Sequence, residues 1–290
     1  MGFLLSVSLL AAATALACCI PGTVLVLRRQ AMMSDALAHA VLPGIAIAAV
    51  VAGASPTSPV LVVGATLSGV AVMALTELLR RQSKFTEDGA TGLVFPVFFS
   101  IGVILISTRL TSSTISEHSV LMGDLNLAAF KHLKVAGHDL GPQEMWLVGA
   151  VGLFAAVVLF VFRRPLIIST FDPVFAHTIG ISTRVLDYAI MTLVSLTVVV
   201  CFHAAGAVLV VALMIVPPAA ALLVSRSLGS MVIITAVVAI AGSQLGFWAA
   251  YHLNAATAPM MAMVDGLLFI CAWALTQVVQ RRRHVAPADV

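Results

Sequence analysis

Nine long apolar runs constrain the fold of this chain more than any other feature of its sequence. The hydrocarbon core of a bilayer is ~30 Å thick, and an α-helix of about 20 apolar residues crosses it. Runs of this length extend over Gly2 to Leu27, Ala31 to Ala52, Pro59 to Leu79, Asp88 to Ser107, Met145 to Phe162, Leu186 to His203, Gly206 to Val224, Met231 to Tyr251 and Pro259 to Val279. The sequence therefore predicts an all-α polytopic membrane protein with nine transmembrane helices.

The composition supports this class and excludes others. Of the 290 residues 61% are apolar and only 9% are charged, against roughly 25% charged in a soluble domain. The 4 cysteines lie inside apolar runs without the spacing of a zinc or redox site. The net charge of +3 comes from short clusters between the runs, which gives no indication of nucleic-acid binding. No linker divides the chain, so we expect one transmembrane domain over residues 1–290.

The basic residues fall mainly in alternate loops and predict the orientation. These loops hold 12 of the 15 Lys and Arg. They contain Arg28 and Arg29; Arg80, Arg81 and Lys84; Arg163, Arg164 and Arg184; Arg226; and Arg281, Arg282 and Arg283. Loops rich in Lys and Arg stay in the cytoplasm, so we expect the N-terminus outside and the C-terminus inside. No basic residue precedes Arg28, which favours a first spanning helix over a signal peptide.

Two segments between the runs are longer than simple turns. The external segment, residues 108–144, is polar. The cytoplasmic segment, residues 165–187, carries Phe171, Phe175 and Ile179 about one helical turn apart, which predicts a short amphipathic helix.

Asp35 and His39 in the second run are the strongest candidates for a binding site. They are four residues apart, so a helix places them on one face. Placing an ionisable side chain deep in a bilayer costs about 2.5 to 3.5 kcal/mol of free energy, so its presence there needs a functional or structural explanation. Pro43 has no N–H to bond the carbonyl of His39, which leaves that oxygen free. A structural ion pair is the alternative, but the small neighbours favour a divalent cation of the Mn, Zn or Fe kind.

Other polar residues are weaker candidates for an ion pathway, and most have a structural interpretation. Asp88 suits a helix N-terminus, and Glu77 is expected to pair with Arg80 or Arg81. The remaining pathway candidates are Glu117, His118, Asp124, His203 and Asp265. We also expect Pro217 and Pro218 to break the seventh helix.

Arg28 and Arg29, followed by the motif Met33 to Gly44, which reads MSDALAHAVLPG, resemble the signature of the membrane permeases of bacterial zinc, manganese and iron ABC importers. The resemblance continues over about residues 20 to 225. It includes EDGATGLVF from Glu87, LMGDL from Leu121, FDPVFAHTIGI from Phe171 and the run from Gly206 to Ala220. The stretch from Glu117 to Leu125 is similar to the manganese and iron subgroup.

The resemblance implies a permease with the fold of type II ABC importers in the bacterial inner membrane. Two permeases, identical or homologous, would form the pore, cytosolic ATPase subunits would drive it, and an extracytoplasmic metal-binding protein would deliver the ion. Asp35 and His39 would line the metal path, and no cofactor would be permanently bound. A coupling helix at about 171–181 would dock on the ATPase. Its contact residues would be Phe171, Asp172, Phe175, Ala176 and Gly180.

Two other functions stay open from the residues themselves. A gradient-driven secondary transporter could use Asp35 and His39 as a proton relay. An intramembrane metalloenzyme would need further strong ligands. The chain has no Gly-Lys pair and hence no Walker motif, so ATP hydrolysis is expected on a separate subunit.

Overall fold

The computed structural model describes residues 2–52, 59–82, 86–109, 125–130, 132–135 and 138–285. The helices in these ranges are α1 (Phe3–Leu27), α2 (Ala31–Ala52), α3 (Pro59–Gln82), α4 (Glu87–Arg109), α6 (Leu125–Ala128), α7 (Gln143–Val161), α8 (Arg163–Phe171), α9 (Pro173–Thr178), α10 (Thr183–Ala205), α11 (Ala207–Val224), α12 (Leu228–Leu253) and α13 (Thr257–Val285). The described strands, β1 (His132–Val135) and β2 (His138–Pro142), form an antiparallel hairpin. Nine of the described helices are long and apolar enough to cross a membrane, which confirms the predicted number of spans. The chain is a multi-pass membrane protein.

The helix boundaries lie within a few residues of the predicted spans, except at the end of α13, and follow local capping. Helix α12 begins at Leu228 rather than Met231, and α10 begins, with an equal shift, at Thr183 rather than Leu186. The Ser182 hydroxyl caps it by accepting a hydrogen bond from the Val185 N–H at 3.4 Å. Asp187, predicted to end the preceding loop, therefore lies in the second turn of α10.

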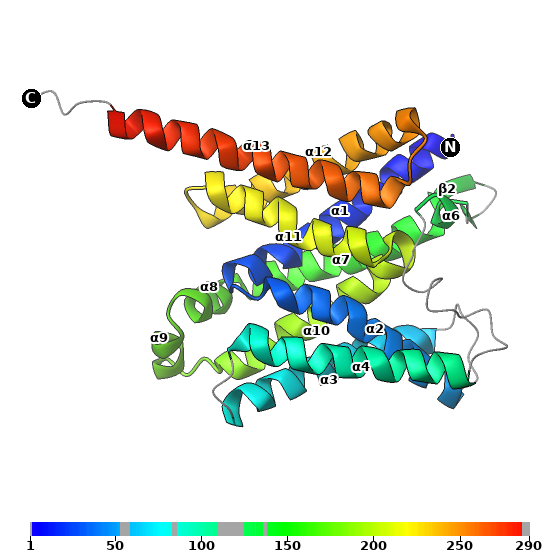
Figure 1. Cartoon of the computed structure of the whole chain (residues 1–290), viewed down its shortest axis with the longest axis horizontal. Helices are drawn as coiled ribbons and strands as arrows, with labels where there is room; N and C mark the ends of the chain where they lie inside the picture. Colours follow the sequence, from blue (N-terminus) through cyan, green and yellow to red (C-terminus); the bar gives the residue numbers. More distant parts are fainter. Residues whose placement is uncertain are drawn as a thin grey trace, which may run out of the picture.

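Six of the nine long helices form two groups of three, α1 and α10 join the groups, and α7 packs on α1 and α10 (Figure 1). The first group contains α2, α3 and α4, which pack on one another. The second contains α11, α12 and α13. Helix α1 packs on α7, α10, α11 and α12, while α10 also contacts α2 and α3. The buried core follows this arrangement, since side chains of α1, α10 and α11 form most of its main cluster.

The two ends of the helical bundle differ (Figure 1). The N-terminus, α6 and β2 lie at one end, which we call the hairpin end. Helices α8 and α9 lie at the opposite end with the C-terminal part of α13, and we call this the α9 end. The part of the predicted external segment that the structure describes as α6 and β2 is therefore separated from the predicted cytoplasmic segment by the length of the bundle.

The expected break in the seventh helix is wrong. Helix α11 runs unbroken through Pro217 and Pro218. Because Pro218 has no N–H, the carbonyl of Met214 loses its usual helical donor. That carbonyl instead faces α1 at Gly22, where a Cβ atom would collide with it. A close backbone contact with the neighbouring helix thus accommodates the proline pair.

The predicted amphipathic helix is two helices rather than one. Phe171 ends α8, Asp172 lies between the helices with φ −141° and ψ 83°, and Phe175 lies in α9. A residue before proline disfavours helical backbone, and Pro173 suits the first position of a new helix. The Asp172 carboxylate caps α9 by accepting a hydrogen bond from the Phe175 N–H at 2.8 Å.

Candidate functional site

Helix α2 places Asp35 and His39 on one face, as their spacing predicts. Asp35 Oδ1 lies 3.7 Å from His39 Nε2, which is longer than a hydrogen bond. The side chains are 42% and 32% exposed, respectively, in the single chain. With a rise of about 1.5 Å per residue, they lie roughly 6 and 12 Å into α2 from the α9 end. Both groups are therefore accessible from outside the chain, on a helix that is long and apolar enough to cross a membrane.

Two aromatic rings of α4 hold the His39 ring. Phe95 stacks on it with ring centres 5.6 Å apart, and Phe99 meets it edge to face at 5.4 Å. His39 Nδ1 is buried and has no hydrogen-bond partner among the described residues. Packing rather than a hydrogen bond thus fixes the ring and turns Nε2 toward Asp35. The sequence does not single out these phenylalanines: their four-residue spacing places them on one face of α4 but does not show which helix that face meets.

A close contact between α4 and α2 supports this arrangement. Gly102 of α4 lies so near Pro43 that a Cβ atom there would be 2.7 Å from the Pro43 nitrogen. Pro43 lies inside the continuous helix α2, and because it has no N–H, the carbonyl of His39 lacks its usual helical donor. The absence of a side chain at Gly102 lets α4 carry its two rings against His39.

Asp35 and His39 can supply two of the ligand atoms that a divalent cation needs. Zinc bonds to His nitrogen and carboxylate oxygen measure about 2.0 to 2.2 Å, so two ligand atoms 3.7 Å apart can reach one ion. A hard oxygen with a borderline nitrogen suits Mn, Fe or Zn. In the part of the chain that the structure describes, no three His, Cys, Asp or Glu residues form a metal-binding group. Water or another chain would have to complete the coordination.

Among the candidates whose side chains the structure describes, neither His203 nor Asp265 lies at this site. His203 is exposed in the last turn of α10. Asp265 is fully buried in α13, and its carboxylate oxygens have no hydrogen-bond partner among the described residues. It lies against Gly242 of α12, in the group of helices away from α2 and α4 (Figure 1). The side chain of Asp88, in the first turn of α4, and the residues Glu117, His118 and Asp124 lie outside what the structure describes.

Helices α8 and α9 expose several large apolar side chains at the α9 end. Phe171, Val174 and Phe175 are 63%, 75% and 51% exposed, whereas Ala176 is fully buried against the bundle. Gly180 then turns the chain with φ +82°, a backbone conformation that favours glycine. These residues match the predicted contact segment, with Phe171 belonging to α8 rather than to α9.

The sequence analysis also missed the packing of Arg28 and Asp187. The sequence predicts Arg28 as a loop charge and as part of the family motif, yet its side chain is 8% exposed and forms an ion pair with Asp187. Glu77 pairs with Arg80 at 2.7 Å, as expected.

Comparison with known proteins identifies the family to which this chain belongs. Residues 1–276 match the model of the ABC 3 transport family. The chain belongs to this family. It is 37% identical over 265 residues to the zinc transport system membrane protein TroD of Treponema pallidum, covering 91% of this chain and 72% of TroD. It is 34% identical over 256 residues to the manganese transport system membrane protein MntD of Bacillus subtilis, covering 88% of this chain and 86% of MntD.

The ABC 3 assignment agrees with the fold. The structure of PsaBC from Streptococcus pneumoniae in complex with Fab superposes with a TM-score of 0.76 at 24% sequence identity. The alignment covers 94% of this chain and 91% of the PsaBC chain. The expected fold of an ABC importer permease is therefore confirmed.

Proposed function

We propose that this ABC 3 family chain is the membrane permease of an ATP-driven importer for divalent transition-metal ions. Asp35 and His39 are the ion-contacting groups in this proposal. The observation that carries it is the accessible oxygen and nitrogen pair, 3.7 Å apart, on a transmembrane helix. Ion binding must replace water ligands and still be weak enough for release, and two ligands from one chain suit that requirement.

The ion we propose is manganese, with zinc and iron as the alternatives. The ligand types suit all three. The stretch from Glu117 to Leu125 is similar to the manganese and iron subgroup, and MntD of Bacillus subtilis is named for manganese. The ion is the transported substrate, and the proposal includes no permanently bound cofactor.

The proposed assembly contains two permeases, cytosolic ATPase subunits and an extracytoplasmic metal-binding protein. A second permease, identical or homologous, would supply the ligands that one chain lacks. The exposed apolar residues of α8 and α9 would contact the ATPase. The helix ends nearest Arg28, Arg80, Arg163 and Arg226 share the α9 end (Figure 1), which supports a cytoplasmic position for that end.

The test is metal uptake by the complete complex in proteoliposomes. Asp35→Asn and His39→Gln should each reduce ATP-dependent ⁵⁴Mn uptake while the subunits still copurify. Glu77→Gln is the matched control, because Glu77 is an acidic side chain of α3 that pairs with Arg80 of the same helix. Uptake that is unchanged in both site variants would refute the site. Uptake by the chain alone in the absence of ATP would instead identify a gradient-driven transporter.

A further inference from the structure

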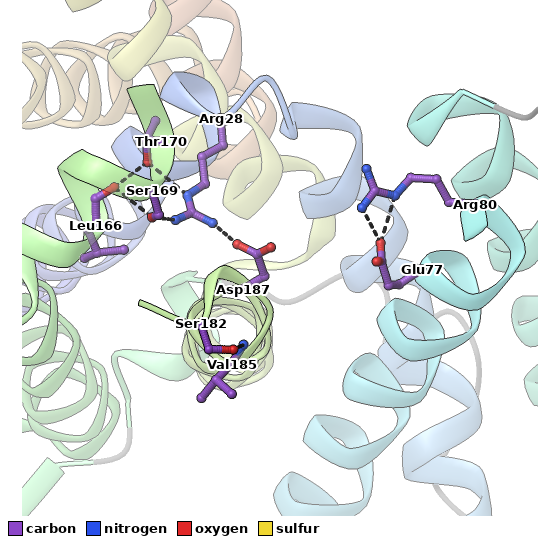
Figure 2. A network of polar contacts seen from close by, with 9 residues as sticks. All are labelled: Arg28, Glu77, Arg80, Leu166, Ser169, Thr170, Ser182, Val185 and Asp187. Carbon is purple, nitrogen blue, oxygen red and sulfur yellow. Dashed lines mark hydrogen bonds and ion pairs between the residues drawn. The ribbon is translucent and has the colours of Figure 1, made fainter. Parts of the chain in front are cut away.

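We propose that Arg28 is a positioning residue that couples the α8–α9 segment to α2, the helix that carries Asp35 and His39. This inference rests on the proposed function, because it assumes that an ATPase acts on α9. Its basis is a buried arginine that joins three parts of the chain at the α9 end (Figure 2).

Arg28 is nearly buried and its guanidinium is well supplied with acceptors. Its Nε donates to Thr170 Oγ1 at 3.2 Å, one terminal nitrogen donates to Ser169 Oγ at 2.7 Å, and the other pairs with Asp187 Oδ1. Burying a charge costs free energy unless it is paired and hydrogen-bonded. Here the partners come from α8 and α10, so the guanidinium holds these two helices against the end of α1.

The two hydroxyl groups on α8 are oriented to accept. Ser169 Oγ and Thr170 Oγ1 each donate to the carbonyl of Leu166, at 3.1 and 2.7 Å. Their hydrogens are thereby directed away, and their lone pairs face the guanidinium. The fork of Arg matches several acceptors at fixed angles, which a neutral amide or a point charge does not reproduce.

The backbone connects this contact to both functional segments. Phe171 directly follows Thr170 and ends α8, so the hydrogen bonds of Arg28 hold the last turn of α8, directly before α9. On the other side, only Arg29 and Gln30 separate Arg28 from α2. Arg29 adopts φ +59°, a left-handed conformation that is uncommon for a residue with a side chain, and this makes the turn tight. A displacement of α8 is therefore passed to the start of α2, roughly 6 Å from Asp35.

The first experiment measures manganese ions imported per ATP hydrolysed by the complete complex in proteoliposomes. Arg28→Gln should lower this ratio about tenfold, because losing a charged hydrogen bond costs more than the 1.4 kcal/mol that corresponds to tenfold. Arg80→Gln is the matched control: Arg80 lies at the same end but is 46% exposed and pairs with Glu77 of its own helix (Figure 2). Its ratio should remain within about twofold of the wild-type ratio, as for an exposed ion pair.

A second variant keeps the inference testable if Arg28→Gln fails to assemble. The double variant Ser169→Ala/Thr170→Val removes the acceptors on α8 and leaves the pair between Arg28 and Asp187. It should assemble with its ATPase and show the same loss of ions imported per ATP. A wild-type ratio in this double variant overturns the inference. Absence of ATP-dependent metal uptake in the wild-type complex would instead refute the proposed function, so the two failures are distinguishable.

Discussion

Replacing Gly102 with alanine should separate α4 from α2 and loosen the metal site. The added Cβ atom would lie 2.7 Å from the Pro43 nitrogen and 3.0 Å from its Cα. Carbon atoms pack at about 3.5 to 4.0 Å, so α4 would have to move by roughly 0.5 to 1 Å. The contacting atoms include backbone of α2, which cannot rotate away as a side chain can. Overpacking of this kind costs about 1 to 3 kcal/mol.

Gly92→Ala on the same helix is the matched control. A Cβ atom there would meet nothing within 4 Å. Both substitutions gain about 1 kcal/mol from the higher helix propensity of alanine. The difference in free energy of unfolding between the two variants, about 1 to 3 kcal/mol in favour of Gly92→Ala, therefore isolates the steric effect.

The assay has two parts. Unfolding of the purified protein in detergent, followed by circular dichroism, gives the difference in stability. Manganese uptake by the complete complex gives the effect on the site, and the KM for manganese should rise in Gly102→Ala because Phe95 and Phe99 move away from His39 with α4. Equal stability and equal KM in the two alanine variants would refute the reasoning that this contact positions His39.

Three further substitutions test other parts of the structure. Asp172→Ala removes the cap of α9 and should destabilise it by about 1 kcal/mol, seen as weaker copurification of the ATPase; unchanged recovery would contradict this. Gly242→Ala should lower the melting temperature because its Cβ would collide with Asp265, and adding Asp265→Ala should restore it; failure of that rescue would contradict the contact. Phe99→Leu should raise the KM for manganese without lowering the melting temperature as much as Gly102→Ala; an unchanged KM would show that the edge-on ring is dispensable.

The nine spans could be predicted because hydrophobicity is a local property of each run. The second run illustrates this, since the predicted bounds Ala31 to Ala52 are those of α2. The shared face of Asp35 and His39 follows equally from helix geometry, which requires no knowledge of other helices.

The features that sequence reasoning missed depend on contacts between distant segments. The spacing of Phe95 and Phe99 gives no information about which helix they face, and only packing brings them to His39. The burial of Arg28 depends on acceptors more than 140 residues away. The error at Pro217 and Pro218 has the same origin, because the free carbonyl of Met214 finds its place against α1 at Gly22.

The break between α8 and α9 was predictable in principle. Asp172 followed by Pro173 is a local signal for the end of one helix and the start of the next. The apolar spacing of Phe171, Phe175 and Ile179 predicts a single helix, but the helix cannot continue across Asp172, which does not adopt helical backbone.

Electron paramagnetic resonance of manganese bound to the permease–ATPase complex tests the central claim most directly. Only the permease would carry ¹⁵N-labelled histidine, so that a ¹⁵N coupling reports a permease histidine bound to the ion. The proposal predicts this coupling in the wild-type complex and its loss in His39→Gln. A coupling that persists in His39→Gln, or bound manganese with no histidine coupling in the wild type, would contradict it.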